Sequence, residues 1–271
     1  MKLFLKSGIA ILSIALLATS CKKENVASVN EVPQDVMKKI EAQGFSTENV
    51  RKVDRGYLVE GDIVLTEENL NSQSVSPSLL IASDEQYRTT NLVKSLPRVI
   101  TVSVGGTLID TVWTKATDAL VSRYNALKLN ITFQRVSSGA NVNIIGFDQG
   151  PSGGYITLGS SGFPTSAGDP YNQIKMNTNP QAYGANPNQG YITSVLQHEM
   201  GHCIGFRHTD YFNRALSCGG SKSNERAGTI GAILIPGTPS GFDAESFMLA
   251  CSAGTDRTFN TNDVVALNYL Y

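Results

Sequence analysis

All three histidines of this chain lie in one short motif, His198-Glu199-x-x-His202-x-x-Gly205-x-x-His208. Imidazole nitrogens are common zinc ligands, and a site with three protein ligands keeps a fourth position for water. Zinc lowers the pKa of such a water to about 7, which makes it a nucleophile at neutral pH. The motif therefore predicts a catalytic zinc site with one open position.

The spacing also predicts how these groups are presented. Positions i and i+4 of a helix lie on one face, so His198 and His202 can point at one metal ion. Gly205 can take the left-handed conformation that ends a helix and reverses the chain, which would return His208 as the third ligand. Glu199 adjoins a ligand without being one, and we expect it to take a proton from the water and pass it to the leaving amine.

A helix with two histidines that serve only packing is the alternative interpretation of the shorter H-E-x-x-H pattern. The full motif uses every histidine of the chain, which favours the metal site. Ile192, Val195 and Leu196 recur at helical spacing before the motif and predict a helix whose opposite face is buried.

The extended motif resembles that of the metzincin metallopeptidases. Met248 stands where that clan has a methionine turn beneath the metal. Ala250 occupies the position of a zinc-binding tyrosine in some metzincins, so the resemblance implies a resting site of three histidines and water. Met200 replaces the usual isoleucine of HEIGH, a change that conserves volume. The segments most similar to the bacterial dual-action HEIGH metallopeptidases are 197–210, 234–239, 246–248 and 268–271.

The resemblance covers roughly residues 90–271 and implies an α+β fold like a metzincin catalytic domain. Its parts would be a mixed twisted sheet, the active-site helix and a small C-terminal subdomain with the methionine turn. It further implies a zinc metalloendopeptidase that hydrolyses peptide bonds in protein or peptide substrates. The alternative is a surface-anchored, zinc-containing binding protein without turnover, although Glu199, which such a protein would lose most readily, is present. A structural zinc site would need Asp210 or a cysteine as fourth ligand.

The N-terminal segment predicts export. Two lysines precede an apolar stretch, residues 8–18, that is too short to serve as a bilayer-spanning anchor. Small residues then precede Cys21 and two further lysines, as in a bacterial lipoprotein signal, so that residues 1–20 would be removed and Cys21 lipidated. Ordinary signal-peptide cleavage after Ser20 is the alternative. The protein would be lipid-anchored to the cell envelope in the first case and secreted in the second.

Export makes disulfides possible. Without Cys21 three cysteines remain, Cys203, Cys218 and Cys251, which allow three pairings and leave one thiol free. We favour the pair Cys218–Cys251 because both residues lie beyond the motif helix, in the part that carries Met248.

A change in charge density divides the remaining chain. Charged residues are denser in 22–95 than in 96–271, and a serine-rich stretch, residues 71–78, precedes the change and predicts a linker. We expect a prodomain and linker over 21–89 and the catalytic domain over 90–271.

The expected prodomain contains a candidate for the metal site. A helix is predicted from Pro33 to Gly44, followed by an extended segment, residues 57–65. The Glu-Gly-Asp sequence ending in Asp62 resembles the element of astacin propeptides whose aspartate occupies the zinc, with Val59 in place of a phenylalanine. The hypothesis is that Asp62 caps the metal in a zymogen, and the alternative is an ordinary turn between strands.

Apolar periodicity predicts a strand, a helix and further strands before the motif helix, and one helix at the end of the chain. The expected elements are a strand over 98–104, a helix over 112–127, strands over 130–136 and 141–147, an edge strand over 155–158, and a final helix over 263–270 capped by Asn260.

The composition excludes some partners. The net charge is −1 and no basic run is present, so we expect no nucleic acid. Membrane contact is expected only through the N-terminal lipid, and we expect a monomer. Asp148 and Asp169 could supply carboxylates to calcium, but their spacing matches no defined calcium loop.

Overall fold

The computed structural model describes residues 32–71, 86–109, 111–152, 154–225, 231–239 and 242–271. Residues Val32–Tyr271 form one compact unit. The predicted lipidation site at Cys21 and all but the first residue of the serine-rich stretch lie outside the described residues. Within the described part, no helix combines the length and the apolar character needed to span a membrane.

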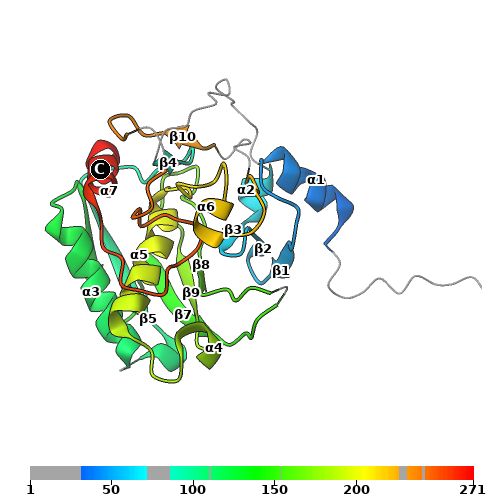
Figure 1. Ribbon diagram of the computed structural model, residues 1–271. Coiled ribbons are helices and arrows are strands. Elements are labelled where there is room, and N and C mark those ends of the chain that lie inside the picture. The colour runs from blue at the N-terminus through cyan, green and yellow to red at the C-terminus, as the bar shows by residue number, and fades with distance from the viewer. Residues whose placement is uncertain (1–31, 72–85, 110, 153, 226–230, 240–241) are drawn as a thin grey trace, which may run out of the picture. The chain divides into compact units, whose positions relative to one another are not determined.

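A five-stranded mixed sheet lies at the centre of this unit (Figure 1). Its strand order is β6-β5-β7-β9-β8, in which β8 runs antiparallel to β9 and all other neighbours are parallel. Alternate side chains of β5, such as Ile100 and Val102, are fully buried in the main core. The strands are β5 (Arg98–Val104), β6 (Ile131–Arg135), β7 (Val142–Phe147), β8 (Gly159–Ser160) and β9 (Gln173–Asn177). The expected α+β fold with a mixed sheet is confirmed.

Two long helices share the main core with this sheet. The helix α3 (Val112–Ala126) is capped by the Thr111 hydroxyl, and α5 (Gln189–Ile204) is capped by Asn188. The Tyr124 hydroxyl of α3 donates to the main-chain oxygen of Gln197 in α5 at 2.9 Å, which ties the two helices together. The shorter helices are the 3-10 turn η1 (Gly106–Leu108), α4 (Pro180–Tyr183) and α6 (Ala215–Cys218).

The last helix, α7 (Thr261–Leu270), begins two residues before its predicted start. Asn260 caps it through the main-chain nitrogen of Asp263, and the Asp263 carboxylate accepts from the Asn260 nitrogen in return. This reciprocal capping satisfies two main-chain donors that a helix start leaves open. The predicted Asn260 cap is therefore confirmed.

The first described segment folds as a small layer with its own apolar cluster, which also includes Phe163. Its strands form an antiparallel sheet in the order β1-β2-β3. Glu60 and Gly61, both with positive φ, make the turn between β2 and β3, so the extended segment expected over 57–65 is a hairpin. The elements are α1 (Gln34–Ala42), β1 (Arg51–Val53), β2 (Gly56–Val59), β3 (Ile63–Leu65) and α2 (Glu67–Asn71).

This layer extends the edge of the central sheet. The Ser161 nitrogen donates to the Asp62 oxygen at 2.9 Å, and the Val64 nitrogen donates to the Ser161 oxygen at 2.6 Å. The resulting bridge between Ile63 and Ser161 is parallel. Residues 62–64 therefore cover the outer edge at the end of β8.

The predicted edge strand over 155–158 is wrong. Tyr155 pairs only with Ser152 and is 65% exposed, and the edge strand is β8 instead. The main-chain nitrogen of Asn177 donates to the Leu158 oxygen at 2.9 Å and its side chain donates to the Thr157 oxygen at 2.8 Å, so main-chain pairing with β9 starts only at the last residue of the predicted range. The strand β9 was not predicted, and a further short pair joins β4 (Tyr87–Arg88) to β10 (Ile233–Leu234).

Candidate metal centre

His198 and His202 lie one turn apart on α5, with ring centroids separated by 4.7 Å. The helix ends at Gly205, which has φ of 110° in the left-handed region, as predicted. A side chain at this position would be strained by that φ, and its Cβ would lie 2.9 Å from the Asn91 oxygen. The left-handed turn therefore requires glycine here.

The turn at Gly205 returns the chain towards the helix. His208 lies beside His202, with 3.2 Å between their Nε2 atoms. Its ring stacks near that of His198 at 5.2 Å between centroids. The three predicted ligands are thus brought to one point by one helix and one turn.

The three imidazoles are oriented so that each leaves Nε2 for a cation. Their Nδ1 atoms contact the main-chain oxygens of Phe247 and Phe206 and the carboxylate of Glu225, at 3.0, 2.8 and 2.8 Å respectively. The Nε2 atom of His198 is buried and has no hydrogen-bond partner. Zinc–nitrogen bonds of about 2.0–2.1 Å in a tetrahedral site place ligand nitrogens about 3.3 Å apart, close to the separation found between His202 and His208. These residues fit a bound zinc ion.

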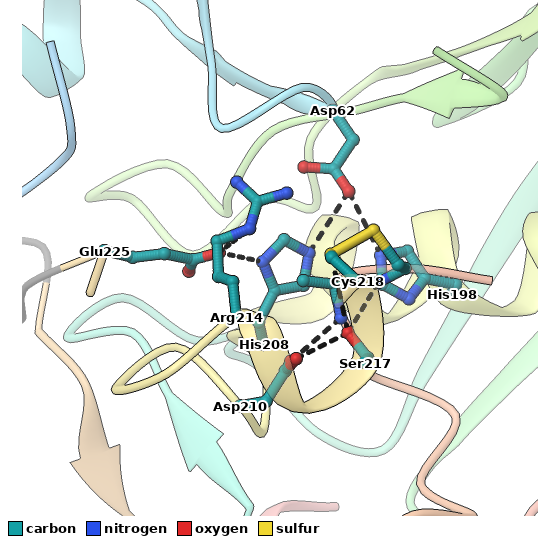
Figure 2. The surroundings of a disulfide bond; sticks show 10 residues. Asp62, His198, His208, Asp210, Arg214, Ser217, Cys218 and Glu225 are labelled. Carbon is teal, nitrogen blue, oxygen red and sulfur yellow. Dashed lines mark hydrogen bonds and ion pairs between the residues drawn. A yellow bond between two sulfur atoms is a disulfide. The ribbon is translucent and has the colours of Figure 1, made fainter. Parts of the chain in front are cut away.

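Asp62 completes the cluster from the first segment (Figure 2). Its Oδ2 atom lies 3.2 Å from Nε2 of His208 and 3.6 Å from Nε2 of His198. Burial alone would raise the pKa of Asp62, but the imidazoles of His208 and His198 hold it well below its usual range. A charged carboxylate therefore faces the position at which a cation would bind.

The imidazoles of His202 and His208 carry opposite pKa shifts. Burial and the neighbouring histidines hold the pKa of His202 well below its usual value. Burial also lowers the pKa of His208, but Glu225 and Asp62 more than offset it, so that this pKa is raised. Of these two histidines, His208 is therefore the one that holds a proton more strongly.

Glu199 is buried on α5, directly after His198. Its Oε2 atom accepts a hydrogen bond of 2.6 Å from the Ser161 hydroxyl at the sheet edge. A Cβ at Gly159 would lie 2.8 Å from Oε1 of Glu199, so this strand must present a glycine there. Burial and the Asp62 carboxylate raise the pKa of Glu199 well above its usual range. A raised pKa suits a group that must both accept and donate a proton.

Met248 is fully buried and packs against α5 at Gly201. If position 201 carried a Cβ, the sulfur of Met248 would be its nearest neighbour. The same turn orients two ligands, because the Phe247 oxygen contacts His198 and the Met248 oxygen accepts from the nitrogen of Thr209, next to His208. Met248 therefore lies beneath the motif, at the place that the resemblance implied.

A disulfide joins Cys218 to Cys251, and Cys203 is a buried free thiol. Figure 2 shows the surroundings of this bridge. Asp210 links the same two loops, since it accepts from the Ala250 nitrogen at 2.9 Å and from the Ser217 hydroxyl at 2.5 Å. Asp210 is thus engaged in a loop contact and belongs to neither potential metal-ligating cluster of the described residues.

The two aspartates considered for calcium do not meet in the structure. Asp148 accepts from the Asn179 side chain, and Asp169 pairs with Arg98. Neither belongs to a potential metal-ligating cluster among the described residues.

Five residues in or next to the site were not predicted: Gly159, Ser161, Gly201, Glu225 and Arg207, whose guanidinium lies 3.5 Å from the Glu225 carboxylate. Gly201 had a usable signal, because a glycine inside a helix costs about 1 kcal/mol relative to alanine and so marks a close approach. Arg207 lies inside the motif, but its burial depends on Phe45 and Phe163, which are remote in sequence. Ser161 and Glu225 carry no local pattern that marks them.

Comparisons with known proteins give one family and a few similar structures. The profile of a family described as dual-action HEIGH metallo-peptidase matches residues 57–271, a range that includes Asp62 and the whole motif. No curated protein matches the chain. Two myroilysin structures are each 16% identical, with TM-scores of 0.41 and 0.40; they cover 66% and 72% of this chain and 82% and 94% of their own. High choriolytic enzyme 1, a hatching-enzyme zinc protease from the medaka fish Oryzias latipes, is 16% identical with a TM-score of 0.38, covering 72% of this chain and 98% of its own. These structural similarities are too low to carry an argument about activity.

Proposed function

Because this chain belongs to the dual-action HEIGH metallo-peptidase family, we propose that it is an exported zinc endopeptidase made with an inhibitory prosegment. Membership of the family makes it a metallopeptidase. The observation that supports zinc and hydrolysis most directly is the convergence of three Nε2 atoms beside the buried carboxylate of Glu199. The identity of the metal, the endopeptidase mode and the export route are parts of this proposal.

His198, His202 and His208 would hold the ion through Nε2, because their Nδ1 atoms are already engaged. When bound there, zinc supplies a Lewis acid for the scissile carbonyl and an acidified water. Asp210 is committed to the Ala250 nitrogen and the Ser217 hydroxyl, which speaks against a closed structural site that uses it as fourth ligand.

Glu199 would take the proton of the attacking water and deliver it to the leaving amine. Ser161 holds the carboxylate in place through its hydroxyl, and Gly159 leaves the space that Oε1 occupies. The raised pKa and the fixed orientation of this carboxylate support the proposed proton transfer.

The outer edge of the sheet at β8 is the proposed place for substrate. Extended peptides commonly bind by adding a strand to an exposed sheet edge. Residues 62–64 already use the main-chain nitrogen and oxygen of Ser161 in this way. A substrate that replaced them would bring its backbone past Glu199 and the three imidazoles.

Substrate would therefore have to displace residues 62–64, and the carboxylate of Asp62, held at the metal position beside His198 and His208, would be what resists that displacement. We extend the proposal to a zymogen in which Asp62 occupies the fourth ligand position and its neighbours block the edge. The prosegment would comprise residues 21–89, and cleavage in the serine-rich stretch would release the enzyme from a lipid on Cys21. Metabolic labelling with a radioactive fatty acid, compared between the parent and Cys21→Ala, tests the anchor.

A reconstitution experiment tests the zinc peptidase itself. The full chain, activated by limited proteolysis or by Asp62→Ala, is stripped with a chelator and then given zinc, calcium or magnesium separately. We expect peptide cleavage to return with about one equivalent of zinc and not with calcium or magnesium. Cleavage that persists in the stripped protein, or that returns equally with calcium, would contradict the proposal.

A further inference from the structure

We propose that Glu225 is a positioning residue that sets the orientation and the tautomer of His208 for metal binding. Oε1 of Glu225 lies 2.8 Å from Nδ1 of His208, and both side chains are fully buried. The inference rests on the proposed zinc site, because His208 is one of its three ligands. Figure 2 shows Glu225 and Asp62 on opposite sides of the His208 ring.

The contact at His208 differs in kind from those at the other two ligands. His198 and His202 are each held through Nδ1 by a main-chain oxygen, of Phe247 and Phe206 respectively. A main-chain oxygen remains when its residue is replaced by another, whereas the carboxylate of Glu225 is lost when Glu225 is replaced. Among the described residues, the orientation of His208 therefore depends on a side chain that one substitution can remove.

Main-chain contacts place Glu225 beside the loop that follows His208. The Glu225 nitrogen donates to the Tyr211 oxygen at 2.8 Å, and the Arg214 nitrogen donates to the Ser223 oxygen at 2.9 Å. These two contacts align residues 223–225 with residues 211–214. The carboxylate consequently reaches His208 from a fixed backbone position.

Two guanidinium groups hold the Glu225 carboxylate. Nε of Arg214 lies 3.3 Å from Oε1, and Nη2 of Arg207 lies 3.5 Å from Oε2. Arg207 is itself fully buried, with its guanidinium 4.4 Å from the ring centroid of Phe45. Positive charge on two sides stabilises a negative carboxylate in the interior. It also makes a second cation site at Glu60, His208 and Glu225 unfavourable, although their ligand atoms lie close together.

A carboxylate accepts but does not donate, so it selects the tautomer in which Nδ1 of His208 carries the proton. Nε2 then keeps its lone pair for the metal. Outer partners of this kind typically change metal affinity by about 10–100-fold when they are removed. Glu225 would act through His208 and would not touch substrate.

Zinc affinity of the full chain tests this role without relying on turnover. We compare the parent with Glu225→Ala, Glu225→Gln and the control Glu60→Gln, by competition with a chromophoric chelator. Glu60 is buried next to the same Arg207, but its carboxylate makes no hydrogen bond with His208 in the described structure. Each protein is measured at a pH above which its affinity no longer changes, so that proton competition does not enter.

We expect Glu225→Ala to weaken zinc binding by about 10–100-fold. Glu225→Gln keeps an acceptor oxygen and should recover much of that loss, whereas Glu60→Gln should stay close to the parent. Zinc binding by Glu225→Ala that equals the parent would overturn the inference. An equal loss in Glu60→Gln would also overturn it, since it would assign the effect to the charge network as a whole.

If Glu225→Ala fails to fold, imidazole ¹⁵N spectra of the zinc-loaded parent and Glu225→Gln decide the question. The inference expects the Nδ1–H tautomer for His208 in the parent, with a changed Nδ1 signal for this ring alone in Glu225→Gln. An unchanged Nδ1 signal would contradict it. A parent that binds zinc but cleaves no peptide would refute the proposed function and leave the role of Glu225 standing.

Discussion

The hydroxyl of Ser161 lies 2.6 Å from Oε2 of Glu199 and 2.9 Å from the main-chain oxygen of the same residue. A hydroxyl has one proton to donate. The carboxylate oxygen, at the shorter distance, is the stronger of the two acceptors. The main chain of Ser161 meanwhile bonds to Asp62 and Val64. One residue thus contacts both the expected proton acceptor and the segment that covers it.

Ser161→Ala should lower kcat/KM by roughly 10- to 100-fold, because a hydrogen bond to a charged group contributes about 1.5–3 kcal/mol. The measurement is peptide cleavage in an Asp62→Ala background, with zinc content checked in each sample. Ser160→Ala, one residue earlier on the same edge, is the matched control and should retain activity. Equal activity of Ser161→Ala and its background would exclude a role in orienting Glu199.

Asp62→Ala should make the full chain active without proteolysis, because loss of the carboxylate that faces His198 and His208 frees the metal position and leaves residues 62–64 held at the edge only by main-chain bonds that a substrate can replace. Asp54→Ala is the control: it removes another aspartate of the first segment, which pairs with Lys175 at 2.6 Å, away from the metal. Initial rates of peptide cleavage by the uncut proteins distinguish them. An Asp62→Ala protein that binds zinc and stays as inert as Asp54→Ala would show that Asp62 is only a turn residue.

Zinc affinity should keep rising with pH beyond the range in which an ordinary histidine has lost its proton. The pKa of metal-free His208 is raised above the usual 6.5, because Glu225 and Asp62 outweigh its burial. Protonated imidazole cannot bind zinc, so affinity falls as pH drops through this raised value. Asp62→Asn removes one of the two charges and should move the midpoint to lower pH. Zinc dissociation constants measured across neutral pH check this, and an affinity that is flat above pH 6.5 would be inconsistent with the raised pKa.

Loss of the Cys218–Cys251 bridge should destabilise the protein by about 3–4 kcal/mol, since it closes a loop with a sequence separation of 33. The double variant Cys218→Ser/Cys251→Ser is compared with the parent in chemical denaturation. The parent whose disulfide has been reduced is denatured in the same way, as a second measurement of the same loss. Indistinguishable unfolding midpoints would mean that the Asp210 contacts alone hold these loops.

Local spacing was enough to predict that His198, His202 and His208 converge, because one helix and one glycine turn place all three. The cap at Asn260 was predictable for the same reason. Glu225 and Ser161 were not, since each meets its partner through the packing of separate elements. The edge strand was misplaced because its pairing with β9 begins only at Leu158, whose oxygen accepts from the Asn177 nitrogen, and this contact joins segments that are separate in the sequence.

The strand β9 shows a different limit. Gln173, Ile174, Met176 and Asn177 are all buried, so the strand lacks the polar–apolar alternation by which a half-buried strand is recognised. Asp62 lies between these cases. Its sequence context allowed both a turn and a metal cap, and the structure places it in a position compatible with both.

The most direct test of the zinc-peptidase account is cleavage of a mixed peptide library by zinc-loaded Asp62→Ala, beside Asp62→Ala/Glu199→Gln at the same zinc content. Mass spectrometry identifies the cuts, and a chelator arm shows their metal dependence. The account predicts internal cuts by the first protein that disappear with the chelator and in the Gln variant. Identical cuts from both zinc-loaded proteins, or none from a folded Asp62→Ala protein, would contradict it.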